Sequence, residues 1–281
     1  MEKKQGKIGT IVLIAIFLIG FLILSYPFIS NWLATRRGIE AADNYEAMTS
    51  SLSDEEREKE WEKAEEYNDH LRGDPVKDPF LPGSGVALPS NYMEVLNIDG
   101  VMCYVEIPSI DVKLPVYHGV SKEVLEKGIG HIESTAFPIG GLGGHPVLTG
   151  HTGLPTAKIF SDLVEMEKGD LFYIHVLGKM LVYEVDQIKV IEPEDLSDLV
   201  AYDDKDYITL LTCTPYGVNS HRLLVRGERI YNFSKRVSII PNRIIYRIIL
   251  GILGVFILLC LIGLISLNRK MKRYRLEKGN E

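Results

Sequence analysis

The chain has 281 residues, a formal net charge of −7 and 46% hydrophobic residues. This length and apolar content are enough for a sizeable core, and the acidic balance argues against nucleic-acid binding, which needs basic patches that displace counterions. Three cysteines, Cys103, Cys213 and Cys260, are too few and too scattered for a disulfide framework or a cysteine-rich zinc site.

Two apolar stretches are long enough to cross the hydrocarbon core of a membrane. Residues 8–29 follow a short basic segment, 1–7, and residues 248–267 precede a basic tail, 268–281. No clear cleavage site follows the first stretch, so it predicts a signal anchor and not a cleaved signal peptide. The positive-inside rule predicts that both termini are cytoplasmic and that the chain between the two transmembrane helices lies outside the cell.

After the first span, residues 30–71 predict a helical stalk. Ser53 and Glu56 have the spacing of a capping box at the start of a charged run. Apolar residues then repeat at helical spacing: Trp61, Ala64, Tyr67 and Leu71. The stretch 72–85 is dense in proline and glycine, which no regular element tolerates, so it predicts a loop.

Residues 86–232 predict one mostly β domain. Short β-like runs alternate with turn residues: YVEIP, VKLPVY, PVLTG, DLFYIHVLG, MLVYEVDQIKVI, YITLLT and RLLVRGERI. Brief helical pieces are expected around 121–127 and 157–163, and a linker, 233–247, leads to the second span. Many short strands at close spacing are typical of a closed barrel or a sandwich.

Cys213 ends the run YITLLT and precedes a Thr-Pro turn. A lone cysteine is most often a small buried hydrophobe, but a strand end places this one at a rim. Arg222 begins the next run, and an antiparallel hairpin would make the two neighbours. His151 follows another strand end, between Gly150 and Gly153. A cysteine nucleophile needs a proton carrier and support for the oxyanion, and these residues are candidates for both. Spacing alone leaves surface roles for the arginine and the histidine open.

The stretches TLLTC and HRLLVRGER resemble the signature of the sortases, membrane-bound cysteine transpeptidases of Gram-positive bacteria. Three further stretches resemble the class C, or pilin-polymerising, sortases: IPSIDVKLPVYHG, GIGHIESTAFPIGG and LTGHTGLPTAKIF. The likeness covers roughly residues 65–231. It implies a mainly β fold, an eight-stranded sortase-type β-barrel with short helices, on the helical stalk and two transmembrane helices.

By this resemblance Cys213 is the nucleophile, His151 the general acid and base, and Arg222 the group that steadies substrate and oxyanion. Thr149 and Thr152 flank the histidine where the family commonly has serine and arginine, so fine substrate contacts are expected to differ.

The family also carries an Asp-Pro-aromatic lid over the active site. The residues Asp78, Pro79 and Phe80 fit it, although an ordinary linker stays open because a second Asp-Pro pair precedes them.

The implied reaction cleaves a Leu-Pro-x-Thr-Gly-type sorting signal between Thr and Gly through a thioester and transfers the acyl group to a pilin lysine. Expected partners are pilin subunits with C-terminal sorting signals, the lysine amine of a second pilin, and membrane lipid. No metal or cofactor is expected, and four histidines are interpreted as structural: His118, His131, His145 and His175. Two alternatives stay open, a sortase that anchors proteins to cell-wall precursor and a catalytically silent membrane scaffold.

Overall fold

The computed structural model describes residues 2–71 and 91–232, together with Gly251 and Gly254. The chain divides into two units, Met1–Arg236 and Val237–Glu281. The described fold therefore belongs to the first unit. The predicted linker 233–247 and basic tail 268–281 lie outside the described residues, as does the predicted second span except for those two glycines.

Two helices open the chain. Helix α1 (Glu2–Ser51) is described with its side chains from Ile14 on, and this part is long and apolar enough to cross a membrane. Its apolar window has a mean hydropathy of 2.0, and none of that window is buried. Helix α2 (Asp54–Leu71) begins at the predicted capping box, because the Ser53 N–H donates to Glu56 Oε2 at 2.8 Å and the Glu56 N–H to Ser53 Oγ at 3.2 Å.

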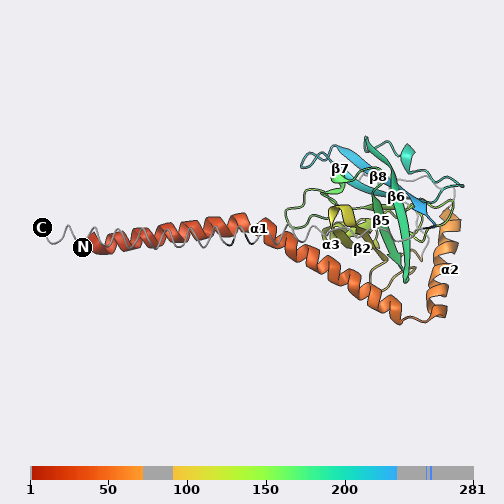
Figure 1. The fold of residues 1–281 in the computed structure, drawn as a ribbon, viewed down its shortest axis with the longest axis horizontal. Coiled ribbons are helices and arrows are strands. Elements are labelled where there is room, and N and C mark those ends of the chain that lie inside the picture. Colours follow the sequence, from red (N-terminus) through yellow and green to blue (C-terminus); the bar gives the residue numbers. More distant parts are fainter. Residues whose placement is uncertain (1, 72–90, 233–250, 252–253, 255–281) are drawn as a thin grey trace. The chain divides into compact units, whose positions relative to one another are not determined.

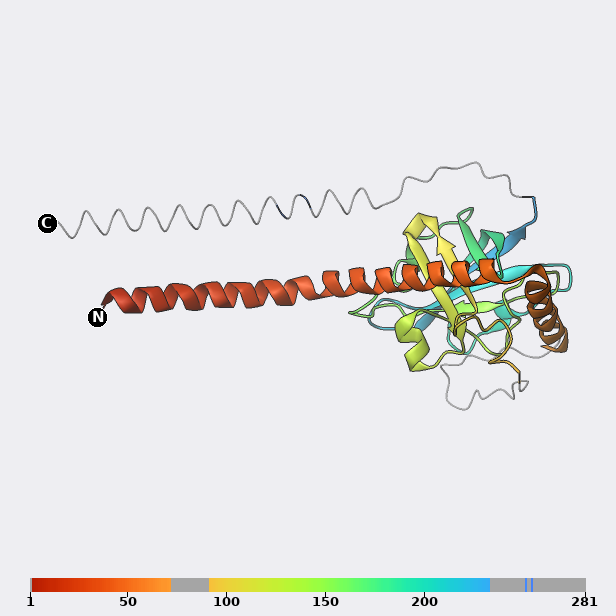
Figure 2. The ribbon, with the colours of Figure 1, turned by 90° about the horizontal axis from the view of Figure 1, so that it is seen from below.

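The second half of α1 packs against the barrel along one stripe. Its residues recur at helical spacing: Ala34, Gly38, Ala42, Tyr45 and Thr49. A Cβ on Gly38 would come within 2.5 Å of Leu114 Cδ2, so the small residue permits close approach to the strand that carries Leu114. The Tyr45 hydroxyl donates to the Met102 carbonyl at 2.9 Å and accepts from the Leu177 N–H at 3.0 Å. Figure 2 shows this half of α1 running beside the barrel.

Eight strands close into a barrel (Figure 1). They are β1 (Cys103–Ile107), β2 (Val112–His118), β3 (Ile129–His131), β4 (Val147–Thr149), β5 (Leu171–Val176), β6 (Lys179–Ile191), β7 (Tyr207–Thr214) and β8 (His221–Ile230), with helix α3 (Lys122–Lys127) between β2 and β3. Around the barrel the order is β1-β2-β3-β4-β7-β8-β6-β5. The pairs β2–β3 and β4–β7 are parallel and the others antiparallel. The eight-stranded barrel expected from the sequence is confirmed.

Two sequence-based expectations need correction. The strand β3 was absent from the predicted runs, which found the other seven. The helical piece expected around 157–163 is wrong: this segment forms turns, and a 3₁₀ turn follows at Leu163–Glu165. Gly153 and Pro155 precede it, and its backbone is held by loop hydrogen bonds such as that from the Phe160 N–H to the His151 carbonyl.

Apolar residues fill the barrel and also cover part of its outer face. The interior includes large buried side chains: Phe137, Phe160, Phe172, Tyr183, Ile208, Leu210 and Val225. A separate outer cluster consists of Ile132, Val147, Ile191, Leu199, Leu211 and Leu224. Because successive strand residues point to opposite faces, β7 has apolar side chains buried on both sides. The connection between β6 and β7 supplies Leu199 to this outer cluster.

Candidate active site

Strand pairing brings Cys213 and Arg222 together. Strands β7 and β8 pair antiparallel, with Cys213 directly opposite Arg222. Side chains of directly opposed residues project from the same face of a sheet, with Cβ atoms about 5 Å apart. The two residues are therefore neighbours in an antiparallel hairpin, as the sequence predicted.

The loop after β4 brings His151 to the same level. Strand β4 runs parallel to β7, and its last pair is Thr149 with Leu211. The next residue stays in register, because the Gly150 N–H donates to the Leu211 carbonyl at 3.1 Å and the Thr212 hydroxyl donates to the Gly150 carbonyl at 2.7 Å. When this parallel register is continued by one more residue, the backbone of His151 lies level with that of Cys213.

The three residues thus form a row across β4, β7 and β8, here called the His-Cys-Arg row. Alternation puts Cys213 on the same face as Leu211 and Thr209, and Leu211 belongs to the outer apolar cluster. The row consequently lies on the outer face of the barrel, beside that cluster. Ile191 of β6 pairs with Arg222 and extends the row with an apolar side chain.

Gly150 is needed for this arrangement. A Cβ at this position would lie 2.8 Å from Phe160 Cδ2 and 2.9 Å from Ile159 Cγ2, and both of these side chains are buried. A larger residue would push the histidine loop away from β7.

Arg222 is 7% exposed, and its Nη1 donates to the His221 carbonyl at 3.3 Å and, at 3.5 Å, to the Asn219 carbonyl. Both carbonyls belong to the turn between β7 and β8 or its edge. His221 Nε2 in turn lies 3.1 Å from Glu192 Oε1. These contacts hold the guanidinium against the backbone of the turn between β7 and β8, and the sequence alone had indicated none of them.

Partial burial lowers the pKa of His151 below its usual value, and the carboxylate of Glu126 on α3 opposes that shift. The imidazole is therefore mostly neutral at pH 7, the form that can accept a proton from a thiol. An exposed glutamate on a short helix carries no sequence signal that would have linked it to this histidine.

The other described thiol differs sharply from Cys213. Cys103 on β1 is fully buried, and burial raises the pKa of its thiol far above the usual range. Cys260 lies outside the described residues. Cys213 is half-buried near the end of β7.

Four further histidines have partners inside the fold. Nε2 of His118 donates to the Val95 carbonyl at 2.7 Å, and Nε2 of His131 donates to the Ala136 carbonyl at 2.8 Å. His175 stacks on Tyr104 with ring centroids 4.2 Å apart. In the described ranges, 2–71 and 91–232, no three His, Cys, Asp or Glu side chains gather closely enough to hold a metal ion.

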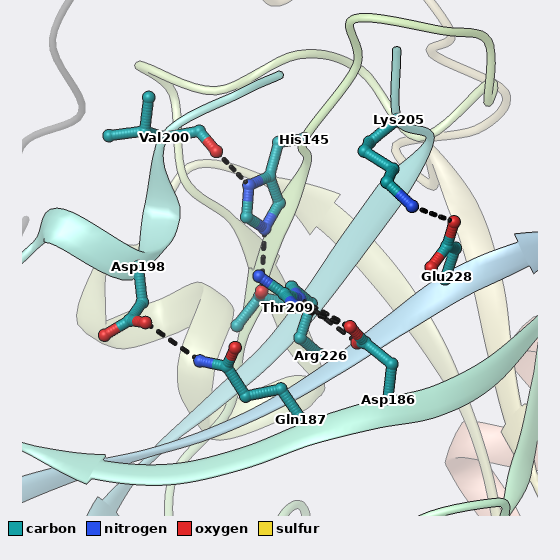
Figure 3. Close-up of polar contacts among 9 residues, drawn as sticks. All are labelled: His145, Asp186, Gln187, Asp198, Val200, Lys205, Thr209, Arg226 and Glu228. Atoms are coloured by element: carbon teal, nitrogen blue, oxygen red, sulfur yellow. Dashed lines mark hydrogen bonds and ion pairs between the residues drawn. The ribbon is translucent and has the colours of Figure 1, made fainter. Parts of the chain in front are cut away.

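His145 belongs to a polar network at the far end of the same outer face (Figure 3). Its Nδ1 donates to the Val200 carbonyl at 2.9 Å, so the neutral Nε2 accepts from the Thr209 hydroxyl at 2.8 Å. Arg226 forms a two-pronged pair with Asp186 and stacks over Tyr207 at 4.1 Å.

In the same network, Asp198 accepts from Gln187 at 2.9 Å and Lys189 at 2.5 Å (Figure 3 shows the Gln187 bond). Through Asp198 and Val200, the network holds the β6–β7 connection against the sheet. That connection also covers the outer apolar cluster next to the His-Cys-Arg row.

The lid residues Asp78, Pro79 and Phe80 lie outside the described residues, so the lid stays a prediction from the sequence.

Comparison with known proteins identifies the family. A model of the sortase domain matches residues 105–230. Sortase C-1 from Actinomyces oris is 47% identical with a TM-score of 0.61, over 63% of this chain and 99% of that one. The pilus-related sortase C of Group B Streptococcus is 42% identical with a TM-score of 0.63, over 67% and 96%.

The curated sortase D of Bacillus subtilis is 30% identical over 128 residues, 44% of this chain and 62% of that protein. The likeness to solved class C enzymes runs through almost their whole length and includes the barrel that carries the His-Cys-Arg row. The chain therefore belongs to the sortase family of cysteine transpeptidases, and its solved neighbours are class C sortases.

Proposed function

We propose that this enzyme polymerises pilins: it cleaves a Leu-Pro-x-Thr-Gly-type sorting signal between Thr and Gly and transfers the acyl group to a pilin lysine. In this proposal Cys213 is the nucleophile, His151 is the general acid and base, and Arg222 is the group that stabilises the oxyanion and holds the substrate. The His-Cys-Arg row carries the proposal, because it brings the one half-buried described thiol level with a histidine and opposite an arginine.

The first half-reaction makes a thioester. His151 accepts the thiol proton, and the Cys213 sulfur attacks the threonine carbonyl carbon. Arg222 stabilises the oxygen that becomes negative in the tetrahedral intermediate. The C–N bond to glycine then breaks, and His151 returns its proton to the departing amine. The lowered pKa of His151 supports the proton return to the amine, because the imidazolium of a weakly basic imidazole gives up its proton readily.

The second half-reaction forms the isopeptide bond. A lysine amine attacks the thioester carbonyl, loses a proton to His151, and expels the Cys213 sulfur. The thioester conserves the energy of the cleaved peptide bond, so the step needs no nucleotide or metal.

The proposed setting is the cell membrane of a Gram-positive bacterium, with residues 8–29 and 248–267 spanning it and the barrel outside. The apolar, unburied start of α1 supports the first anchor. Likeness to the pilus-related sortase C of Group B Streptococcus supports pilins as partners. Anchoring of proteins to cell-wall precursor is the alternative that differs only in the second amine.

A competition assay tests this proposal. The full chain in detergent is given a peptide that contains Leu-Pro-Glu-Thr-Gly, together with a lysine-bearing pilin domain and a cell-wall-precursor amine. We expect the acyl group on the pilin lysine. Cys213→Ala should abolish product, and His151→Ala or Arg222→Ala should slow it by roughly 10²-fold or more, the usual scale for losing a proton carrier or an oxyanion donor.

Cys103→Ala is the matched control, because it deletes the other described thiol and should leave turnover in place. Product formed by Cys213→Ala would refute the nucleophile. Transfer to the cell-wall amine in preference to lysine would refute pilin polymerisation and favour wall anchoring.

A further inference from the structure

The loop that follows His151 is bonded to helix α1. The Lys158 N–H donates to Asn31 Oδ1 at 2.8 Å, and the Ser30 hydroxyl donates to the Thr156 carbonyl at 3.1 Å. These contacts join segments far apart in the sequence. They tie the N-terminal helix to the loop that begins at His151.

The bonded turn of α1 continues the stripe that packs on the barrel. Asn31 precedes Ala34 by one helical turn, and Ala34 packs against the interior cluster. Gly38 follows on the same stripe and is buried. The contact to the loop is thus the first turn of an interface that continues to Thr49, and a continuous helix holds it in place.

The loop transmits this contact to His151 because it is internally tied. The Phe160 N–H donates to the His151 carbonyl at 3.1 Å, and the Gly153 N–H donates to Ser161 Oγ at 3.1 Å. Phe160 is buried beneath Gly150. A shift at residues 156–158 therefore acts on the backbone of His151 through a short, closed segment.

The same turn lies where the apolar part of α1 ends. The side chains of residues 14–19 and 21–24 are exposed along the helix, and the aromatic residues Tyr26 and Trp32 are 57% and 55% exposed. Exposed tyrosine and tryptophan at the end of an apolar stretch are typical of a membrane interface. The bonded loop is therefore adjacent to the point where the anchor helix would leave the bilayer.

We propose that Ser30 and Asn31 are positioning residues for the transpeptidation, holding the loop that carries His151 level with Cys213. The anchor helix then has a second role besides tethering, since its exit turn supports the active-site histidine. This inference rests on the proposed function, in which His151 carries the proton.

Three variants of the full chain in detergent test it. Asn31→Ala removes the acceptor for the Lys158 N–H, Asn31→Asp keeps an oxygen there, and Asn44→Ala makes the same change at an exposed asparagine of the same helix. Two quantities are measured: hydrogen exchange at the Lys158 and Phe160 amides, and kcat and KM with the Leu-Pro-Glu-Thr-Gly peptide.

We expect Asn31→Ala to speed exchange at both amides and to lower kcat about threefold to tenfold, the equivalent of one lost hydrogen bond, with KM little changed. Asn31→Asp should restore both exchange and kcat, and Asn44→Ala should match the parent. The rescue by aspartate separates loss of the acceptor from a general disturbance of the helix.

The inference is overturned if Asn31→Ala has the same amide exchange rates and the same kcat as Asn44→Ala. It is also overturned if amide exchange in Asn31→Ala rises while kcat stays at the parental value. A third contradicting result is a kcat for Asn31→Asp that is as low as that of Asn31→Ala. Failure of the proposed function has a different signature. In that case His151→Ala turns over normally, while the exchange data still report whether α1 holds the loop.

Discussion

Burial keeps individual histidines of this barrel neutral, although their bonds to backbone carbonyls oppose the lowering of the pKa. Burial lowers the pKa of His145 to about 4 and that of His131 to about 3. In the unfolded chain both return to an ordinary value near 6.5. Between these limits the unfolded state binds protons that the folded barrel excludes, so stability is full above about pH 6.5 and declines as the pH falls.

His145→Gln keeps a donor for Val200 and an acceptor for Thr209 but removes one of these buried titrating groups. The parent should lose up to about 1.4 kcal/mol of unfolding free energy per pH unit for each such histidine below pH 6.5. Thermal melts followed by circular dichroism should therefore show a smaller drop in Tm between pH 7 and pH 5 for the variant than for the parent.

The exposed Asn44 supplies the control, since Asn44→Gln removes no titratable group and should keep the parental pH dependence. An unchanged pH dependence in His145→Gln would mean that its imidazole is not held neutral by the fold.

The sequence alone predicted part of the site. The end of one β-run and the start of the next were enough to predict that Cys213 and Arg222 are neighbours, because a hairpin is a local structure. Periodicity could not bring His151 to them, since β4 and β7 are joined by a parallel pairing across distant parts of the chain. The strand end and the glycines beside His151 made it a candidate, but only the family resemblance linked it to Cys213.

Among the elements, β3 shows why a strand can escape prediction. It is short and contains Gly130, and glycine lowers the strand signal. The structure explains the glycine: a Cβ there would lie 2.4 Å from the Gly119 carbonyl oxygen, which belongs to the backbone and cannot swing away. The close approach of the two backbones thus requires a glycine in this strand, and for that reason the side-chain pattern does not reveal it.

Gly130→Ala should consequently strain the contact between β3 and the backbone that directly follows β2. Overpacking of this kind costs about 1–3 kcal/mol. We expect a lower Tm in thermal melts of the full chain in detergent.

Gly20→Ala is the matched control, because its Cβ would meet no heavy atom within 4 Å. A parental Tm for Gly130→Ala would contradict the close approach.

The second half of helix α1 was predicted as part of a stalk, residues 30–71, and its packing against the barrel was missed. The stripe that touches the barrel is made largely of small residues such as Ala34, Gly38 and Ala42, which give little hydrophobic contrast. By comparison, the capping box and apolar spacing of α2 were strong local signals, and both are confirmed: Ala64 and Tyr67 are buried.

For the whole molecule, the charges around the two apolar stretches predict a two-pass topology. A reporter fused after Glu281 should be cytoplasmic. A cysteine introduced at Ser90 should react with an impermeant thiol reagent added to intact cells, because the positive-inside rule puts the intervening chain outside.

The same reagent should fail to label a cysteine introduced at Gln5 until the cells are opened. Labelling of Gln5→Cys but not Ser90→Cys in intact cells would reverse the topology, and a barrel on the cytoplasmic side could not meet secreted pilins.

The most direct test of Cys213 as the nucleophile is the site of the covalent intermediate. The full chain is incubated with a Leu-Pro-Glu-Thr-Gly peptide without an acceptor amine, quenched in acid, digested and mapped by mass spectrometry. We predict an acyl group, linked through its threonine carbonyl, on the fragment that contains Cys213. An adduct on the fragment that contains Cys103, or none on any cysteine while the peptide is cleaved, would contradict the assignment of Cys213 as the nucleophile.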